Sequence, residues 1–170
     1  MNVKRVGSIL DENQAQVARA LRASLSYLMK TLEAKAAREL ALDLQIPLKI
    51  ARSRFRSFRN NRGNQALLSG SWHSLPAILL GKASRSGDGL KVGNRFFKGG
   101  FVARSSFSTK LPKRVFRRRT GKRFPLVEDR LDIKKEVSRS LDQVLGLAFD
   151  LFRKRFEHEL RYRLKGGNPS

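Results

Sequence analysis

The chain of 170 residues has no cysteine, two histidines and only 14 acidic residues. The absence of cysteine excludes disulfide bonds, thiolate catalysis and metal sites with cysteine ligands, and it fits a reducing compartment. The two histidines, His73 and His158, are far apart, and neither has a second histidine at metal-ligand spacing, so we expect structural or surface roles for both. We therefore expect no catalytic, metal-binding or cofactor-binding residues and no enzyme activity.

The sequence also has no apolar run that approaches the roughly 18 residues needed to span a bilayer. Its first residues have a little positive charge but no apolar signal segment. We expect a soluble protein that is made inside a cell and has no membrane partner. Hydrophobic residues make up 40% of the chain, which can supply a core, so we predict one folded domain over residues 1–170.

The chain has a large excess of positive charge, because 37 lysines and arginines give a formal net charge of +23. From Leu44 to Val127, twenty basic residues accompany a single acid, Asp88, whereas both ends of the chain mix the two signs. Like charges that crowd together repel and weaken a compact state. One interpretation is a generally basic protein that its charge keeps soluble. The sharper interpretation is that the middle region faces a polyanion or an acidic partner.

Two basic stretches in this region interleave arginines with apolar residues. Arginine outnumbers lysine in both, and its planar guanidinium group forms fork-like contacts with phosphate or carboxylate. The alternative for any single arginine is an ion pair with an acid of the helices or of a neighbouring subunit. The predicted contacts with DNA or an acidic partner are Arg52, Arg54, Arg56, Arg59, Lys113, Arg114, Arg117, Arg118, Arg119, Lys122 and Arg123.

Apolar residues at spacings of three and four predict two long amphipathic helices. The first covers residues 11–44, and Asp11 is expected to be its N-cap. Pro47 then breaks the pattern and begins a short basic helix over residues 47–56. The last helix covers residues 132–165.

Residues 72–131 predict short strands and turns, because glycine, asparagine and serine interrupt the apolar stretches. Strands are expected at 75–80, 90–92, 101–104, 114–118 and 125–131, loops at 62–70, 85–89 and 105–111, a turn at Gly99-Gly100, and the end of the last helix at Gly166-Gly167. We therefore predict an α+β fold in which two long amphipathic helices pack on a small antiparallel β-sheet, with a short basic helix after the first.

The segment from Ala37 to Arg52 has the helix, break and basic helix of a helix-turn-helix motif. In that alternative, the helix after Pro47 would enter the major groove of DNA, with Lys49 and the following arginines reaching bases and phosphates. Gln45 stands where such turns commonly have glycine, and the first helix is longer than usual. A sequence-specific DNA-binding regulator is thus a second hypothesis. A basic RNA-associated protein with exposed stacking aromatics is a third.

Several short motifs follow one another along residues 31–133. They are Ala37-Arg38-Glu39-Leu40 before Ile46-Pro47, Leu75-Pro76-Ala77-Ile78-Leu79-Leu80-Gly81, Gly89-Leu90-Lys91-Val92-Gly93-Asn94-Arg95-Phe96, Gly100-Phe101-Val102-Ala103, Val115-Phe116-Arg117-Arg118 and Gly121-Lys122-Arg123-Phe124-Pro125-Leu126. In this order they resemble the minor tail protein Z family of long-tailed bacteriophages, the tail completion proteins. Phe124 departs from the family pattern, which has a smaller residue before the proline.

The resemblance implies a structural virion protein, made in the host cytoplasm, that acts at the head-proximal end of the tail in tail completion or head-to-tail joining. It also implies a ring of identical subunits, expected to be a hexamer because long tails have sixfold symmetry, with other tail or neck proteins as neighbours. The basic middle region adds an expectation from the residues themselves. Arginines that line such a ring would attract the passing genomic DNA without reading its bases.

Overall fold

The computed structural model describes residues 3–60, 65–103, 113–120 and 122–164. Contacts between residues group the chain into two compact units, which are described separately. Unit 1 consists of Met1–Ala36, Phe55–Ser69 and Leu141–Ser170, and unit 2 consists of Ala37–Arg54 and Gly70–Ser140. The single domain that the sequence predicts stays a prediction.

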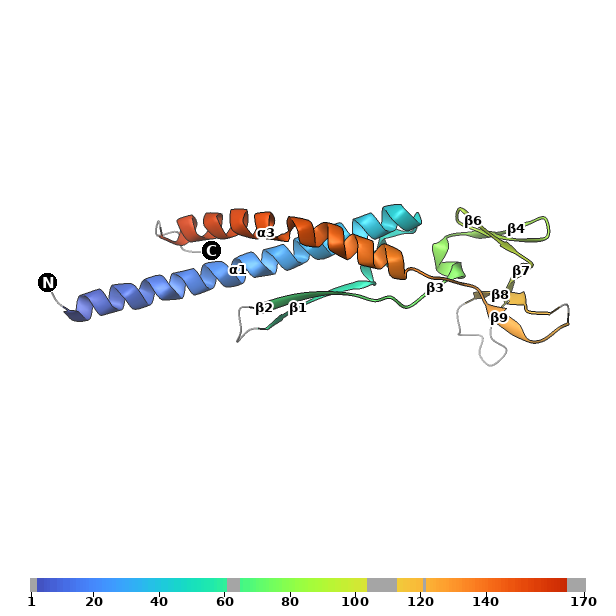
Figure 1. Ribbon diagram of the computed structural model, residues 1–170, viewed down its shortest axis with the longest axis horizontal. Coiled ribbons are helices and arrows are strands. Elements are labelled where there is room, and N and C mark those ends of the chain that lie inside the picture. The colour runs from blue at the N-terminus through green and yellow to red at the C-terminus, as the bar shows by residue number, and fades with distance from the viewer. Residues whose placement is uncertain (1–2, 61–64, 104–112, 121, 165–170) are drawn as a thin grey trace. The chain divides into compact units, whose positions relative to one another are not determined.

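Helices and strands both occur in the described residues, which confirms the mixed helix-and-sheet class (Figure 1). The helices are α1 (Val3–Leu44), α2 (Leu48–Arg52), the 3-10 helix η1 (Ala77–Leu80) and α3 (Lys134–Leu164). The strands are β1 (Phe55–Asn60), β2 (Gln65–Gly70), β3 (Leu75–Pro76), β4 (Ala83–Ser86), β5 (Gly89–Val92), β6 (Arg95–Lys98), β7 (Gly100–Ala103), β8 (Arg114–Arg118), β9 (Leu126–Glu128) and β10 (Arg130–Leu131).

Helix α1 begins at Val3, so Asp11 lies inside the helix and is not its N-cap. That prediction was wrong because the apolar spacing of three and four continues toward the N-terminus through Leu10 and Val6. The end of the helix at Leu44 agrees with the prediction.

The chain leaves α1 at Gln45, whose φ of 53° lies in the left-handed region. Pro47 then precedes α2, as expected for a residue that fits the start of a helix. The predicted helix over residues 47–56 was too long, because α2 ends at Arg52 and β1 begins at Phe55. Burial alternates over the first residues of β1, and this period of two is that of a strand.

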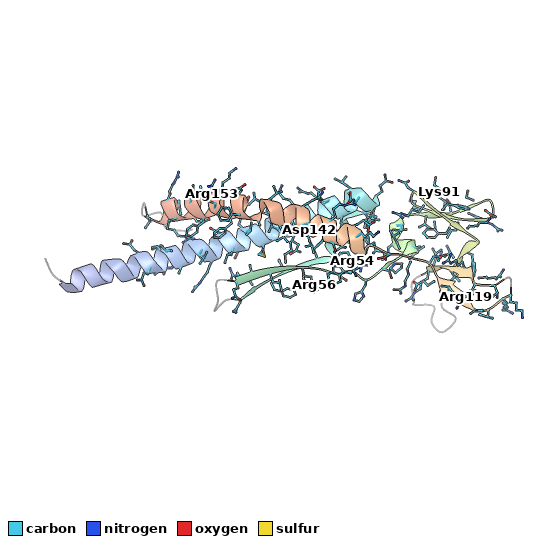
Figure 2. All side chains as sticks on the ribbon, viewed as in Figure 1. Arg54, Arg56, Lys91, Arg119, Asp142 and Arg153 are labelled. Carbon is cyan, nitrogen blue, oxygen red and sulfur yellow. The ribbon has the colours of Figure 1, made fainter. Side chains whose placement is uncertain are left out.

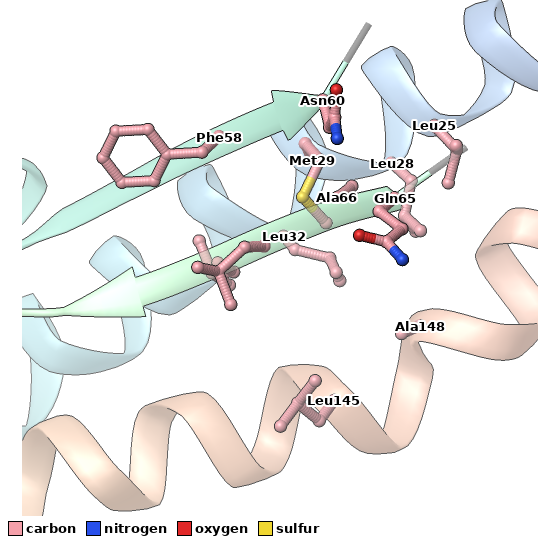
Figure 3. A pocket seen from close by; sticks show the side chains of 12 residues that line it. Leu25, Leu28, Met29, Leu32, Phe58, Asn60, Gln65, Ala66, Leu145 and Ala148 are labelled. Atoms are coloured by element: carbon pink, nitrogen blue, oxygen red, sulfur yellow. The ribbon is translucent and has the colours of Figure 1, made fainter. Parts of the chain in front are cut away.

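The strands of the described residues form four small sheets, so the prediction of a single sheet was wrong. Two sheets pair β1 with β2 and β3 with β10, and two have three strands in the orders β4-β5-β6 and β7-β8-β9. The pairs β3–β10, β4–β5, β5–β6, β7–β8 and β8–β9 are antiparallel, as predicted. Strands β1 and β2 also run in opposite directions (Figure 3). Most strands are short and pair with their neighbour along the chain, which keeps the sheets separate.

Two segments that were predicted as loops contain strands. Strand β2 lies within residues 62–70, and the hairpin of β4 and β5 includes residues 85–89, where Gly87 has a φ of 52°. Strand β6 was also missed. In each case the chain folds back onto a neighbouring strand, and hairpin hydrogen bonding outweighs the weak strand propensity of the serines and glycines.

The remaining strand predictions are mostly confirmed. Strands β5, β7 and β8 match the predictions, and Gly99, with a φ of 65°, forms the expected turn. The predicted strand 75–80 is instead β3 followed by η1, and the predicted strand 125–131 is divided into β9 and β10 at Asp129. The predictions for residues 105–111 and Gly166-Gly167 lie outside the described residues.

In unit 1, side chains connect α1 to both the β1–β2 hairpin and α3. The hydroxyl of Ser57 on β1 donates a hydrogen bond of 2.6 Å to Glu33 Oε2 on α1. The guanidinium group of Arg155 on α3 lies 4.8 Å from the ring centre of Tyr27 on α1, a cation–π contact. Leu32 of α1, which is 1% exposed, belongs to the core between these elements.

In unit 2, the core gathers apolar side chains from the sheets, from β3 and from the start of α3. Ile133 and Val137 are fully buried, and Asp132 Oδ1 accepts a 3.0 Å hydrogen bond from the Lys134 backbone N–H at the first turn of α3. The fully buried residues of the strands include Leu75 and Val92. This core supports the sheet that carries the second basic stretch.

Candidate polyanion-binding surface

Strand β8 sends its arginines to two sides of the sheet. Val115 is 1% exposed and faces the core, so Arg117, two residues further along, leaves the strand on the same side. Arg114, Phe116 and Arg118 leave it on the other side. The arginines of β8 therefore have different surroundings, although they are close in sequence.

Glu128 at the end of β9 accepts hydrogen bonds from two arginines. Its Oε2 lies 2.9 Å from Arg130 Nη2, 3.0 Å from Arg130 Nε and 3.4 Å from Arg114 Nη1. The register of β8 and β9 places Glu128 opposite Phe116, and this brings the carboxylate within reach of Arg114. Glu128 thus compensates part of the charge of Arg114 and Arg130 inside unit 2.

Asp129 holds a third arginine, because its Oδ1 lies 3.1 Å from Arg117 Nε. The side chain of Asp129 is buried, and burial raises the pKa of its carboxyl group, while the charge of Arg117 lowers it. The backbone N–H of Asp129 donates to the Val115 carbonyl and its own carbonyl accepts from the Ala77 N–H, both at 2.9 Å. Arg117 thus stabilises a structural residue.

Four cations at the end of the β8–β9 hairpin have no acidic partner among the described residues. All four are exposed. The backbone N–H of Arg119 donates a 3.3 Å hydrogen bond to the Pro125 carbonyl, and this bond closes the end of the hairpin. Figure 2 shows Arg119 at this end. We call the four residues the tip cluster: Arg118, Arg119, Lys122 and Arg123.

Aromatic rings orient two members of the tip cluster. The guanidinium carbon of Arg118 lies 5.6 Å from the ring centre of Phe101, and that of Arg123 lies 5.8 Å from the ring centre of Phe124. Such contacts direct a guanidinium group without neutralising its charge. A hollow of about 330 Å³ beside them is lined by Arg117, Arg118, Arg119 and Val127. The arrangement offers several N–H donors to phosphate groups or carboxylates.

The other predicted contact residues of unit 2 do not join the tip cluster. Lys113 is exposed at the opposite end of β8, and Arg52 is exposed at the end of α2. Arg54 is half-buried, and burial lowers the pKa of its guanidinium group. Its Nε has no hydrogen-bond partner among the described residues.

The two predicted contact residues of β1 belong to unit 1. Arg59 donates hydrogen bonds to the Arg22 carbonyl, at 3.2 Å, and to the Ser26 hydroxyl, so it connects β1 to α1. Arg56 is exposed. Since the tip cluster lies in unit 2, a continuous surface that includes both stretches stays a prediction.

Sequence reasoning missed a further group of exposed cations on the β4-β5-β6 sheet. In the sequence its residues are separated from one another, and the tight turns that bring them together are indicated only by Gly87 and Gly93, which both have a positive φ. Asp88 Oδ2 lies 3.8 Å from Lys98 Nζ. The exposed cations of this sheet and its edges are Lys82, Arg85, Lys91, Arg95 and Lys98.

Unit 1 has an apolar groove of about 900 Å³ between α1, the β1–β2 hairpin and α3 (Figure 3). Its lining is made mostly of aliphatic side chains and includes the amides Asn60 and Gln65. Such a lining suits the surface of another protein better than a phosphate group. We call it the apolar groove; its lining includes Leu25, Leu28, Met29, Leu32, Phe58, Leu145 and Ala148.

His73 and His158 are exposed. Within the described ranges, no three histidine or acidic side chains gather as a metal site would require. No helix among these residues is long and apolar enough to cross a membrane.

Comparison of the chain with protein-family models, with curated proteins and with solved structures gives no match.

Proposed function

We propose that the chain is a structural protein of a long-tailed phage, or of a prophage-derived tail, that acts in tail completion or head-to-tail joining. The ordered motifs along residues 31–133 support this proposal. In this function, identical subunits form a ring at the head-proximal end of the tail, and the ring contacts other tail or neck proteins. The long helices α1 and α3 are proposed to pack the subunits together, with the small sheets carrying the basic surface.

The tip cluster supports a role in contacting DNA. Its four cations have no acidic partner in the described residues, and uncompensated like charges weaken a compact state unless a counter-charge binds them. In a ring, the same cluster recurs on every subunit and faces the polyanion from several directions. Binding of DNA would then release counterions and depend steeply on salt, with no preference for sequence.

The alternative of a helix-turn-helix regulator has less support. Helix α2 has five residues, which is less than two turns, and both Arg54 and Arg56 lie outside it. A recognition helix presents several side chains along its length to base edges in the major groove. The geometry therefore supports contact with phosphate by the tip cluster better than base readout by α2.

The test is charge reversal in the tip cluster with a matched control. The variant Arg118→Glu/Arg119→Glu removes the charge of the cluster, and the control Arg85→Glu/Lys91→Glu makes the same change in net charge on the β4-β5-β6 sheet. We expect the first variant to lose most of its binding to random-sequence duplex DNA at moderate salt, and the control to lose less. In the encoding phage, the first variant is expected to lower the yield of infectious particles.

The outcomes separate DNA from an acidic protein partner. Loss of infectious particles together with unchanged DNA binding would identify an acidic neighbour as the partner of the cluster. Unchanged particle assembly and unchanged DNA binding in the first variant would contradict the proposal. Strong preference for one DNA sequence that persists at moderate salt would support the regulator instead.

A further inference from the structure

Helix α3 carries an apolar stripe that begins at the edge of the apolar groove and that unit 1 leaves largely exposed. Leu145 and Phe149 are four residues apart, so they lie on one face of the helix, and they are 59% and 72% exposed. Val144, which is 1% exposed, marks the inward side of the helix. Exposed leucine and phenylalanine on the same helix face indicate contact with another protein.

Two unpaired acids lie beside this stripe. Asp142, Gly146 and Asp150 follow one another at spacings of four residues, so they form a row along the helix next to the row of Leu145 and Phe149. In the part of the chain that the structure describes, these are the exposed acids with neither an ion pair nor a hydrogen bond. The other exposed acids pair with a cation or cap a helix: Asp43, Asp88, Asp132 and Glu157. Free carboxylates in so basic a chain indicate a basic partner surface.

Gly146 lies on the same side of α3, between the two acids. A glycine inside a helix costs about 1 kcal/mol relative to alanine. Nothing lies within 4 Å of the position that a Cβ atom would occupy, so packing within the chain does not require glycine here. Close approach of another backbone or side chain would explain it.

The β1–β2 hairpin carries a face of complementary character. The side chains of Ser57 and Arg59 bind α1, so Arg56 and Phe58, which alternate with them, lie on the opposite face of β1. Phe58 is 56% exposed, and Leu67 of β2 is 62% exposed. Arg56 is exposed and has no ion pair among the described residues (Figure 2). This face is apolar and basic, whereas the face of α3 is apolar and acidic.

We infer that the α3 face of one copy (Asp142, Leu145, Gly146, Phe149 and Asp150) packs against the hairpin face of a neighbouring copy (Arg56, Phe58 and Leu67). The two surfaces differ, so the contact is heterologous, and repetition around an axis generates a ring. The interface rests on the proposed function in that it supplies the subunit contact of the proposed ring. The apolar groove borders both faces, since Phe58 and Leu145 both belong to its lining.

The first test reverses the charges on each face. We expect Arg56→Glu, and separately Asp142→Arg/Asp150→Arg, to weaken self-association of the full chain at least about tenfold, because each variant places like charges in contact. The combination of all three substitutions restores opposite charges and is expected to recover association. Native mass spectrometry and sedimentation over a concentration series measure the oligomer. Lys91→Glu makes the same change in net charge as Arg56→Glu and is its matched control, and Asp88→Arg is a control for reversal of an exposed acid away from the α3 face.

The second test uses Gly146→Gln, which adds bulk to the α3 face without changing charge. The monomer is expected to keep its stability or gain some, because glutamine is a better helix former than glycine and its Cβ meets no atom. Association is expected to fall by about tenfold or more because the side chain separates the two faces. Urea unfolding of the same variant checks that its fold is intact.

The outcomes distinguish this interface from the proposed function. Wild-type rings that persist unchanged in all these variants would overturn the interface and leave the tail function standing. Recovery in the triple variant would support the interface, and loss without recovery would overturn the pairing of these faces. A wild-type chain that stays monomeric at every concentration would overturn the interface, while DNA binding by the tip cluster would still be decided by its own titration.

Discussion

Arg117 Nε lies 3.1 Å from Oδ1 of the buried Asp129, whereas the next residue, Arg118, lies over the ring of Phe101 and has no acidic partner in the described residues. Two adjacent arginines of one strand thus have different roles, because successive side chains of a strand point to opposite faces. Arg117 stabilises the fold, and Arg118 presents its charge to solvent.

This difference predicts unequal effects of two alanine substitutions on the free energy of unfolding. Arg117→Ala should lower the free energy of unfolding by about 1–3 kcal/mol, because it leaves a buried carboxylate without its partner. Arg118→Ala should change it by less than about 0.5 kcal/mol, as is usual for exposed positions. Urea unfolding of the two variants and the wild type measures both values. Equal effects would show that the ion pair does not stabilise unit 2.

Binding of DNA should depend on the exposed arginines of the tip cluster and much less on an arginine that is paired with an acid. Arg119→Ala removes an exposed cation of the tip cluster, so the slope of log K against log salt for random duplex DNA should decrease by about 1. Arg114→Ala, whose guanidinium group is already paired with Glu128, should change the slope by much less. Fluorescence anisotropy over a salt series provides the slopes. A larger change for Arg114 than for Arg119 would place the binding surface elsewhere.

The sequence predicted the elements whose pattern is local. Strand β8 was predicted with its observed bounds because apolar Val115 and Phe116 lie among arginines and turn residues, and the break after α1 was predicted from Pro47. The first two residues of strand β1, Phe55 and Arg56, were predicted as the end of the basic helix, because arginines alternate with phenylalanines at spacings that suit both structures. The strand is held against α1 by the hydrogen bond between Ser57 and Glu33. These two residues are far apart in the sequence, so their contact leaves no local pattern.

For the candidate site, residue types were predictable and partners were not. Glu128 and Asp129 come directly after the basic region, and only the β8–β9 register brings them back against Arg114 and Arg117. The unpaired state of the tip cluster follows from the same register, since its members lie at and beyond the end of the paired strands. The register of β8 and β9 therefore decides which arginines are paired with an acid and which stay exposed.

Gly93 and Gly87 provide a matched pair for backbone geometry. Both have a positive φ, 56° and 52°, but a Cβ on Gly93 would lie 2.4 Å from the Leu80 carbonyl oxygen, whereas a Cβ on Gly87 would meet nothing within 4 Å. Gly87→Ala should therefore cost about 1 kcal/mol for its conformation alone. Gly93→Ala should cost clearly more, because the backbone of Leu80 must also move. Thermal unfolding of both variants compares them, and equal costs would show that the turn can move away from Leu80.

The buried carboxyl group of Asp129 predicts a pH dependence of known sign. Its pKa is raised in the folded protein by burial, so the folded state holds the proton more tightly than the unfolded chain does. The ionised group therefore opposes folding at neutral pH, and this penalty disappears as the pH falls below the ordinary carboxyl range. We expect the free energy of unfolding of the wild type, relative to Asp129→Asn, to rise between about pH 7 and about pH 3. Urea titrations of both proteins across this range, with Asp88→Asn as an exposed control, measure the difference. A fall over the same range would mean that Arg117 outweighs burial and holds the pKa of Asp129 below its ordinary value.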